Sequence, residues 1–212
     1  MMSFSEDPPL HPTAQKLVDT VIEMLETTSY NNIKSENVLS RSGITRGPLY
    51  HHFADFDDLI QTAQVQMYKK FVYEVTEQLV GVIAAADSLE HARGELHRFI
   101  EVRSETITDT NLRQRIGIIH NAASMPNLRE KLRSTQEALT QQWMRAYQIC
   151  LDRGWADPEM DPRAVSVLMQ SSFVGRVLDR MSTTQMGYQE WVNVLSRLFD
   201  CFFFIKGKLN QP

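Results

Sequence analysis

A short stretch of the chain gathers side chains that could contact a nucleic acid. Arg46 and Gly47 open this stretch, and Tyr50, His51 and His52 follow after Pro48 and Leu49. An arginine can donate two hydrogen bonds to the edge of a guanine, and a glycine lets the backbone come close to a ligand. Tyrosine and histidine can donate to phosphate oxygens. These residue types favour contact with bases and phosphates.

Two short helices and a turn must position these side chains. The first helix is expected at about 35–41 and to end at Gly43, which can take the positive φ of a sharp turn. The second helix is expected to begin after Thr45, a residue suited to the N-cap. Leu49 and Phe53 are spaced four residues apart and should point inward. The pattern predicts a helix–turn–helix motif, and an ordinary corner between two helices is the alternative.

The rest of the chain is expected to be helical. Its eight prolines leave 49–125 and 127–157 uninterrupted, and no segment alternates as a strand would. A first amphipathic helix should begin near Pro12. Longer helices are predicted at about 56–85, 88–108, 111–123, 126–153, 161–181 and 188–207. The predicted fold class is all-α, with about nine helices.

The charge balance argues against a uniformly basic nucleic-acid-binding protein. The 212 residues hold 22 Lys and Arg against 26 Asp and Glu, a formal net charge of −4. Residues 1–60 hold four of these cations and nine of the acids. If this region binds DNA, it must do so through few cationic contacts, and its affinity should depend only modestly on salt.

Other features bound the class of protein. Cys150 and Cys201 belong to no metal-binding or disulfide pattern, and reduced thiols are expected. No signal peptide and no run of 18 apolar residues is found, so a cytoplasmic protein without a membrane partner is expected. No catalytic or phosphate-loop motif is present, so neither an enzyme nor a cofactor or metal is expected. The alternative is a helical enzyme or protein-interaction module that uses the C-terminal helices, with His97, Glu101 and His120 as its polar groups.

The segments Ser42-Gly43-Ile44-Thr45-Arg46-Gly47 and Leu49-Tyr50-His51-His52-Phe53 resemble the tetracycline-repressor (TetR) family of bacterial transcription regulators. Asp57-Asp58-Leu59, at the start of a long helix, adds to the resemblance. It implies a disordered tail at 1–10, a DNA-binding domain at 11–70 with the motif at about 33–53, and an effector-binding and dimerisation domain at 71–212. It also implies a ligand-responsive DNA-binding regulator of transcription, a repressor that a small molecule releases from a pseudo-palindromic operator in double-stranded DNA.

The resemblance assigns DNA contacts residue by residue. Thr45 would cap the recognition helix and bind a phosphate, and Arg46 would read a base edge. Family members usually carry a lysine near the start of the fourth helix, where this chain has Phe56, so that phosphate contact is lost or taken over by other residues. The predicted contacts are Lys34, Ser35, Arg41, Thr45, Arg46, Gly47, Pro48, Tyr50, His51 and His52.

The later helices offer a candidate ligand pocket and a candidate dimer interface. Aromatic, soft and polar side chains are typical linings of small-molecule cavities, although plain core packing is the alternative. The candidate pocket residues are Ile100, Ile116, His120, Trp143, Met144, Tyr147, Met169 and Phe173. The last two helices, about 161–181 and 188–207, are expected to form a homodimer because they carry more phenylalanine than one flank can bury. These are Phe199, Phe202, Phe203 and Phe204, and the alternative is a monomer that tucks them inward.

Overall fold

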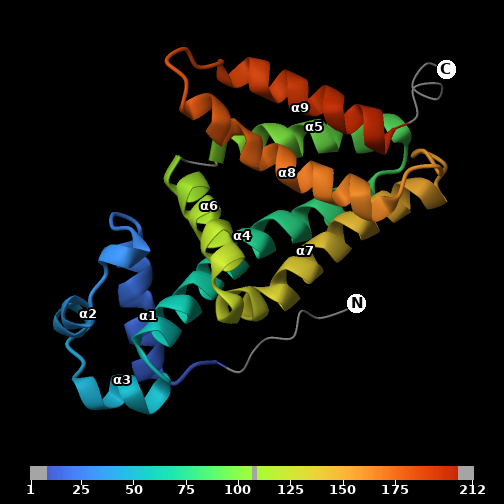
Figure 1. Ribbon diagram of the computed structural model, residues 1–212. Helices are drawn as coiled ribbons and strands as arrows, with labels where there is room; N and C mark the ends of the chain where they lie inside the picture. Colours follow the sequence, from blue (N-terminus) through green and yellow to red (C-terminus); the bar gives the residue numbers. More distant parts are fainter. Residues whose placement is uncertain (1–8, 107–108, 205–212) are drawn as a thin grey trace. The chain divides into compact units, whose positions relative to one another are not determined.

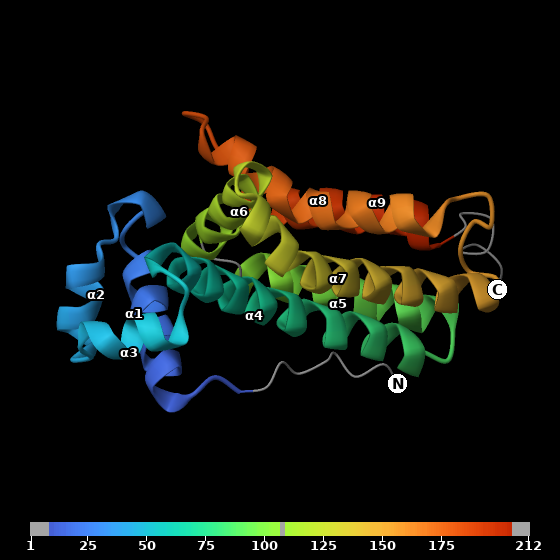
Figure 2. The ribbon, with the colours of Figure 1, turned by 60° about the horizontal axis from the view of Figure 1, so that its bottom comes forward.

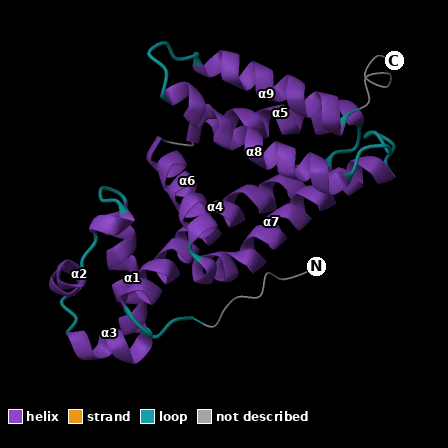
Figure 3. Ribbon diagram, in the orientation of Figure 1, coloured by secondary structure: helices purple, strands orange, loops and turns teal. Residues whose placement is uncertain are grey.

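The chain folds into helices joined by short loops (Figure 1). The structure is a computed structural model. It describes residues 9–106 and 109–204, except for the side chains of 72–77, 106, 109, 173 and 180. All regular elements in these ranges are helical (Figure 3), which confirms the predicted fold class, all-α. No helix in the described ranges combines the length and the apolar character needed to cross a membrane.

The helices in chain order are α1 (Pro12–Leu25), a 3-10 turn η1 (Tyr30–Asn32), α2 (Ser35–Ser42), α3 (Arg46–His52), α4 (Phe56–Ala85), α5 (Leu89–Thr106), α6 (Asp109–Ser124), α7 (Pro126–Asp152), α8 (Pro162–Arg180) and α9 (Tyr188–Phe203). The last helix ends at Phe203, short of the predicted end at 207, because Phe204 is extended, and residues 205–207 lie outside the described residues.

Local capping signals account for the starts of α4 and α8. The carboxylate of Asp55 accepts a hydrogen bond of 2.7 Å from the backbone N–H of Asp58 at the start of α4. Asp161 caps α8 in the same way, and its carboxylate accepts from the N–H of Ala164 at 2.7 Å. Acidic side chains at these positions satisfy helix N–H groups that have no partner within the helix.

The chain forms two compact units, and each of them is built from two separate stretches of sequence. The first unit combines the described part of Met1–Phe71 with Gly117–Ser134, and the second combines Val72–Ile116 with the described part of Thr135–Pro212. The first therefore contains α1 to α3 and the start of α4, together with the end of α6 and the start of α7.

The core of the first unit holds the motif helices in place. Leu17, Val18 and Val21 on α1 are fully buried, as are Val38 on α2 and Leu49 on α3. This is the inward face that the helical periodicity predicts, because residues three and four apart share one side of a helix. The α1–α2 and α1–α3 contacts thus leave the opposite faces of α2 and α3 free to meet a partner.

An aromatic cluster forms the core of the second unit. Trp143 and Tyr147 on α7 meet Phe203 on α9, with ring centroids 6.4 and 5.5 Å from that of Phe203. Phe199 stacks on Phe203 at 5.9 Å. Phe199 and Phe203 are 0% exposed and Phe204 is 1% exposed. The expectation that one chain cannot bury its phenylalanines is therefore wrong for Phe199, Phe203 and Phe204, because two large aromatic side chains of α7 pack in this cluster. Phe202 is half-buried.

Three helices converge around this core. Both α5 and α8 pack against α9, and Figures 1 and 2 show α8 and α9 side by side. At the far end of α7, the guanidinium of Arg153 donates to the backbone carbonyls of Ile83, Ala84 and Ala86 at 2.7–3.1 Å. These bonds satisfy carbonyl groups at the end of α4 that the helix itself leaves without a partner.

Candidate nucleic-acid interface

The turn between α2 and α3 has the conformation that its glycine predicts. Gly43 has a φ of 67°, in the left-handed region, and its N–H donates to the carbonyl of Leu39 at 3.0 Å. A side chain at this φ would be strained, whereas glycine adopts it readily. The turn lets Leu49 and Phe53 enter the core, where they are 0% and 5% exposed.

All ten predicted DNA contacts lie at least partly at the surface. Ser35, Pro48 and His52 are half-buried, and the other seven are exposed. The exposed seven are Lys34, Arg41, Thr45, Arg46, Gly47, Tyr50 and His51. The first turn of α3 is thereby presented to solvent together with the N-terminal end of α2.

At the start of α3, neither capping nor packing within the chain explains the residue types at Thr45 and Gly47. Thr45 occupies the N-cap position, but its side chain makes no capping hydrogen bond. A Cβ added to Gly47 would meet nothing within 4 Å, so packing within the chain does not require a glycine there. An outside partner that approaches the backbone closely is a physical reason for glycine at such a position.

Arg46 and Glu36 form an ion pair on this surface. The guanidinium Nη2 of Arg46 lies 3.5 Å from Oε1 of Glu36, and both side chains are about two-thirds exposed. Hydrogen bonding to the backbone N–H of Glu36 and to the Ser35 hydroxyl, and then the charges of Arg46 and Lys34, lower the pKa of the Glu36 carboxyl. Glu36 was not among the residues predicted from the sequence. An acid in the first turn of a helix is typical of any helix start, so the sequence alone did not single it out.

Three imidazole rings gather at the other end of α3. The ring of His52 stacks on that of His11 with centroids 4.9 Å apart, and it meets His51 edge-on at 4.9 Å. His11 caps α1, because its Nδ1 accepts from the N–H of Thr13 at 3.2 Å. Burial first, and then the charges of His11 and His51, lower the pKa of His52. Sequence reasoning missed His11, since it lies 41 residues before its partner.

Solved structures with this architecture are regulators of transcription. No protein-family model and no curated protein matches the sequence. A protein assigned to the TetR family from Mesorhizobium loti MAFF303099 is 15% identical, with a TM-score of 0.70, over 89% of this chain and 95% of that one. A TetR-family regulator from a Rhodococcus species is 17% identical, with a TM-score of 0.65, over 90% and 98%.

A third neighbour is a transcriptional regulator from Saccharomonospora viridis, solved in complex with choline. It is 12% identical, with a TM-score of 0.66, over 88% of this chain and 95% of that one. The three likenesses extend over almost the whole length of each chain. The protein has the TetR-family fold.

One departure from the TetR pattern becomes clearer in the structure. Phe56, at the position where a lysine is usual, is half-buried and packs against the core of the first unit. A lysine does reach the start of α4, but it comes from α7. The ammonium of Lys131 contacts the carboxylate of Asp58, in the first turn of α4. These two residues are 73 positions apart in the sequence, so their contact could not be predicted from local sequence patterns.

The predicted pocket residues do not all come together in the TetR fold of this chain. Ile100, Trp143, Tyr147 and Met169 are 0–1% exposed in the second unit. Met144 and Ile116 are half-buried there, and the side chain of Phe173 lies outside the described residues. His120 is exposed and belongs to the first unit. The ring contacts of Trp143 and Tyr147 with Phe203 are those of a packed core.

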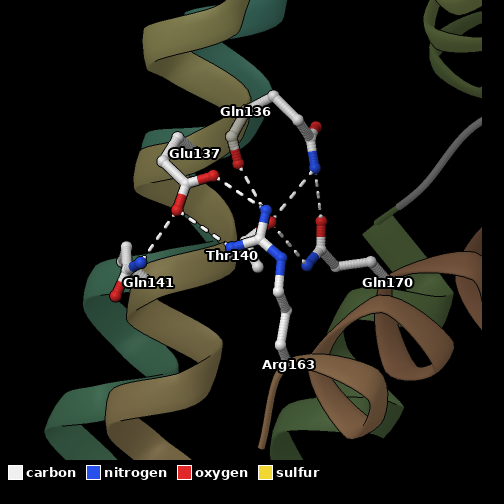
Figure 4. A network of polar contacts seen from close by, with 6 residues as sticks. All are labelled: Gln136, Glu137, Thr140, Gln141, Arg163 and Gln170. Carbon is white, nitrogen blue, oxygen red and sulfur yellow. Dashed lines mark hydrogen bonds and ion pairs between the residues drawn. The ribbon is translucent and has the colours of Figure 1, made fainter.

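Sequence reasoning also missed a polar network between α7 and α8 (Figure 4). The amide of Gln136 donates to the amide oxygen of Gln170 at 2.9 Å, and Gln170 in turn lies 3.4 Å from the hydroxyl of Thr140. Thr140 and Gln170 are buried. Next to them, both Nη atoms of Arg163 bind the carboxylate of Glu137 at 2.9–3.0 Å, and hydrogen bonds from Arg163 and Gln141 lower the pKa of Glu137 to about 2.

Of the polar groups of the alternative enzyme hypothesis, the side chain of His97 is bound within the fold. Nε2 of His97 lies 2.7 Å from Oδ1 of Asp200 on α9, and Arg93 binds Oδ2 of the same carboxylate at 2.9–3.1 Å. The backbone carbonyl of Glu101 accepts from the hydroxyl of Tyr188 at 2.8 Å. Among the described side chains, no three from His, Cys, Asp and Glu are placed to hold a metal ion.

Proposed function

We propose that the protein is a ligand-responsive DNA-binding regulator of transcription, a cytoplasmic homodimer that represses by occupying its operator. The observation that carries the proposal is the outward face of α2 and α3. Gly43 sets the turn, and buried Leu49 and Phe53 anchor α3 with Arg46 and Gly47 at its exposed start. A helix held in this way can enter the major groove with its N-terminal residues toward the bases.

Each side chain of this face has a chemical role in the proposal. Arg46 donates to guanine O6 and N7, and the bare backbone at Gly47 lets α3 approach the base edges. Thr45 and Tyr50 donate to phosphates and fix the position of the helix on the duplex. Lys34, at the N-cap position of α2, neutralises a further phosphate.

The charge of the first unit supports a modest electrostatic contribution. Counting Gly117–Ser134 with the N-terminal part gives nine Lys and Arg against ten Asp and Glu, a net charge of −1. This unit is therefore nearly neutral, although residues 1–60 alone are strongly acidic. We expect few released counterions per protomer, each of which contributes about −0.9 to the slope of log K against log salt.

The test is selection from a pool of random-sequence DNA duplexes, followed by affinity measurement on the enriched duplex and on DNA upstream of the protein's own gene. Arg46→Gln should lose about 10–100-fold in affinity for the enriched duplex, as expected for one bidentate base contact. The matched control is Arg133→Gln, which removes the same charge from an exposed side chain of the first unit that pairs with Glu130. The proposal is wrong if selection enriches no sequence, or if both variants lose affinity equally.

The dimer interface in the proposal lies on the exposed apolar faces of α8 and α9. Val167 and Leu178 on α8, Met181 just after it and Val194 on α9 are 51–75% exposed. Trp191 adds to this area, since it packs 3.8 Å from the Cβ position of Gly175. Solvent-exposed apolar side chains of this size mark partner surfaces, and a four-helix bundle of two copies would cover them.

Sedimentation tests the interface. The wild type should sediment as a dimer at micromolar concentration, and Leu178→Glu should sediment as a monomer with unchanged helical content. Ile119→Glu, which places the same charge at an exposed apolar position on α6, should remain a dimer. A monomeric wild type would refute the dimer.

The effector in the proposal is a small molecule bound by the second unit. The solved neighbour that holds choline supports this idea for the fold. Half-buried Met144 and Ile116 remain candidate pocket residues in the proposal, while buried Trp143 and Tyr147 act as the packed wall. The effector releases DNA to the extent that it binds the free protein more tightly than the DNA-bound protein. A ligand that raises the melting temperature but leaves DNA affinity unchanged would not be the effector.

A further inference from the structure

Glu36 is an acid on the very surface that is proposed to meet DNA. Its carboxylate lies 3.5 Å from the guanidinium of Arg46, and both groups are open to solvent. It sits in the first turn of α2, next to Lys34 and Ser35. An exposed carboxyl is ionised at neutral pH, and hydrogen bonds from the backbone and from Ser35 lower the pKa of Glu36 further. A DNA-binding face therefore carries a permanent negative charge beside its central arginine.

The pair contributes little to the stability of the fold. Ion pairs between exposed side chains are screened by water and salt, and they cost side-chain entropy. The first-turn position also gives Glu36 a favourable interaction with the α2 dipole, which it would have without Arg46. Neither effect explains why the carboxylate lies against Arg46. The ion pair therefore matters through its effect on how Arg46 binds a partner.

The pair affects random and cognate DNA differently. On random DNA, Arg46 meets mainly phosphates, and moving toward them costs it the Glu36 contact while the carboxylate is repelled by the same phosphates. On a cognate site, Arg46 gains two directed hydrogen bonds to a guanine, which offset that loss. An acid placed beside the reading arginine therefore weakens random binding more than cognate binding. Specificity is the difference between those two affinities.

We propose that Glu36 is a specificity-determining residue, which holds Arg46 away from phosphates so that only a matching base edge engages it. This inference rests on the proposed DNA-binding function. In this proposal Glu36 increases specificity by opposing contact with phosphates, whereas the other residues of the surface bind DNA directly.

The test compares Glu36→Gln with a matched control on two probes. The control is Glu23→Gln, which removes the same charge from an exposed position of α1 in the first unit. The probes are a fixed random-sequence duplex and the duplex enriched by selection with the wild type. Glu36→Gln should bind the random duplex about 5–10-fold more tightly, with a salt slope steeper by about 1, because Arg46 gains a phosphate contact.

On the enriched duplex, Glu36→Gln should change affinity by less than about 3-fold, so the specificity ratio falls. Glu23→Gln should change both affinities by less than about 2-fold, since its charge is remote from Arg46. In an Arg46→Gln background, the gain from Glu36→Gln on the random duplex should be smaller than in the wild-type background, because only the direct repulsion between Glu36 and the phosphates is then relieved. The double variant separates action through Arg46 from a general change of charge.

Two results overturn the inference while leaving the proposed function intact. One is an equal gain for Glu36→Gln and Glu23→Gln on random DNA. The other is a gain from Glu36→Gln that is as large without Arg46 as with it. A wild type that binds neither duplex overturns the proposed function itself and the inference with it. Melting temperatures of all variants identify any loss of DNA binding that comes from misfolding.

Discussion

Lys131 contacts Asp58 across 73 residues of sequence, which ties the start of α7 to the start of α4. Asp58 also accepts a hydrogen bond of 3.0 Å from the backbone N–H of Ala54. Both side chains are about one-third exposed and belong to the first unit. The contact links two segments of the first unit that are distant in sequence, at the helix that follows the helix–turn–helix motif.

Replacing Lys131 with Met should therefore destabilise the first unit. Burial favours the neutral form of Asp58, but the hydrogen bonds from Lys131 and Ala54 outweigh it and lower the pKa of Asp58. We expect Lys131→Met to lower the free energy of unfolding by about 1 kcal/mol near neutral pH, measured by urea denaturation. Lys131→Arg keeps the charge and should lose less.

The pH dependence of that loss has a definite sign. Asp58 is ionised more easily in the folded chain, so the unfolded chain binds more protons in acid. Its contribution is complete above the ordinary carboxyl pKa of 3.8 and is lost as the pH falls through the lowered folded value. The difference between wild type and Lys131→Met should shrink in the same range. A difference that grows in acid would contradict the assignment.

The imidazole stack predicts a second pH effect, at milder pH. The lowered pKa of His52 means that the folded chain resists its protonation and that the unfolded chain takes up the proton first. Stability from the stack should be full above the ordinary histidine pKa of 6.5 and should fall as the pH drops below it. Melting temperatures across this range should decline less steeply for His52→Gln than for the wild type. His120→Gln, at an exposed position, should follow the wild type.

Replacing Gly47 tests the proposed DNA contact separately from the stability of the fold. Since a Cβ at this position meets nothing within 4 Å, Gly47→Ala should leave the fold intact. It should raise the free energy of unfolding by at most about 1 kcal/mol, as alanine favours a helix over glycine. Affinity for the enriched duplex should fall by about 10-fold or more, because the methyl group stands between backbone and bases. Gly94→Ala, at an equally open position on α5, should leave DNA affinity unchanged.

The two kinds of apolar residue on α9 should respond differently to truncation. Phe203 is fully buried among aromatic rings, and Phe203→Ala should cost about 3–5 kcal/mol of unfolding free energy. Val194 is 60% exposed within one chain, and Val194→Ala should cost less than about 1 kcal/mol in a dilute, monomeric sample. Urea unfolding of both variants measures the contrast. Similar losses of unfolding free energy for the two variants would contradict the assignment of Phe203 to the buried face and Val194 to the exposed face of α9.

Features set by neighbouring residues could be predicted from the sequence. The positive φ of Gly43 and the acidic caps at Asp55 and Asp161 depend on local steric and hydrogen-bonding rules, and the structure has all three. The inward turn of Leu49 follows from helical periodicity in the same way. These rules involve only residues within a few positions of each other, so no knowledge of the tertiary fold is needed.

Features set by tertiary packing could not be predicted in this way. Periodicity tells which face of α9 is apolar but not what covers it, so Phe199 and Phe203 were assigned to a partner when Trp143 already buries them. The His11–His52 stack has the same origin, since it joins residues that are distant in sequence. The polar pair of Gln136 and Gln170 could have been suspected only as an interruption of apolar helix faces.

The division of the first unit into two stretches of sequence limits how this protein can be taken apart. A fragment cut after Phe71 would lack Lys131, and also Leu128 and Leu132, which are buried in the complete chain. Exchanging only an N-terminal piece with another protein of this fold would leave the graft without its own 117–134 segment. Chimeras should therefore exchange both stretches, or keep Asp58 and Lys131 from the same parent.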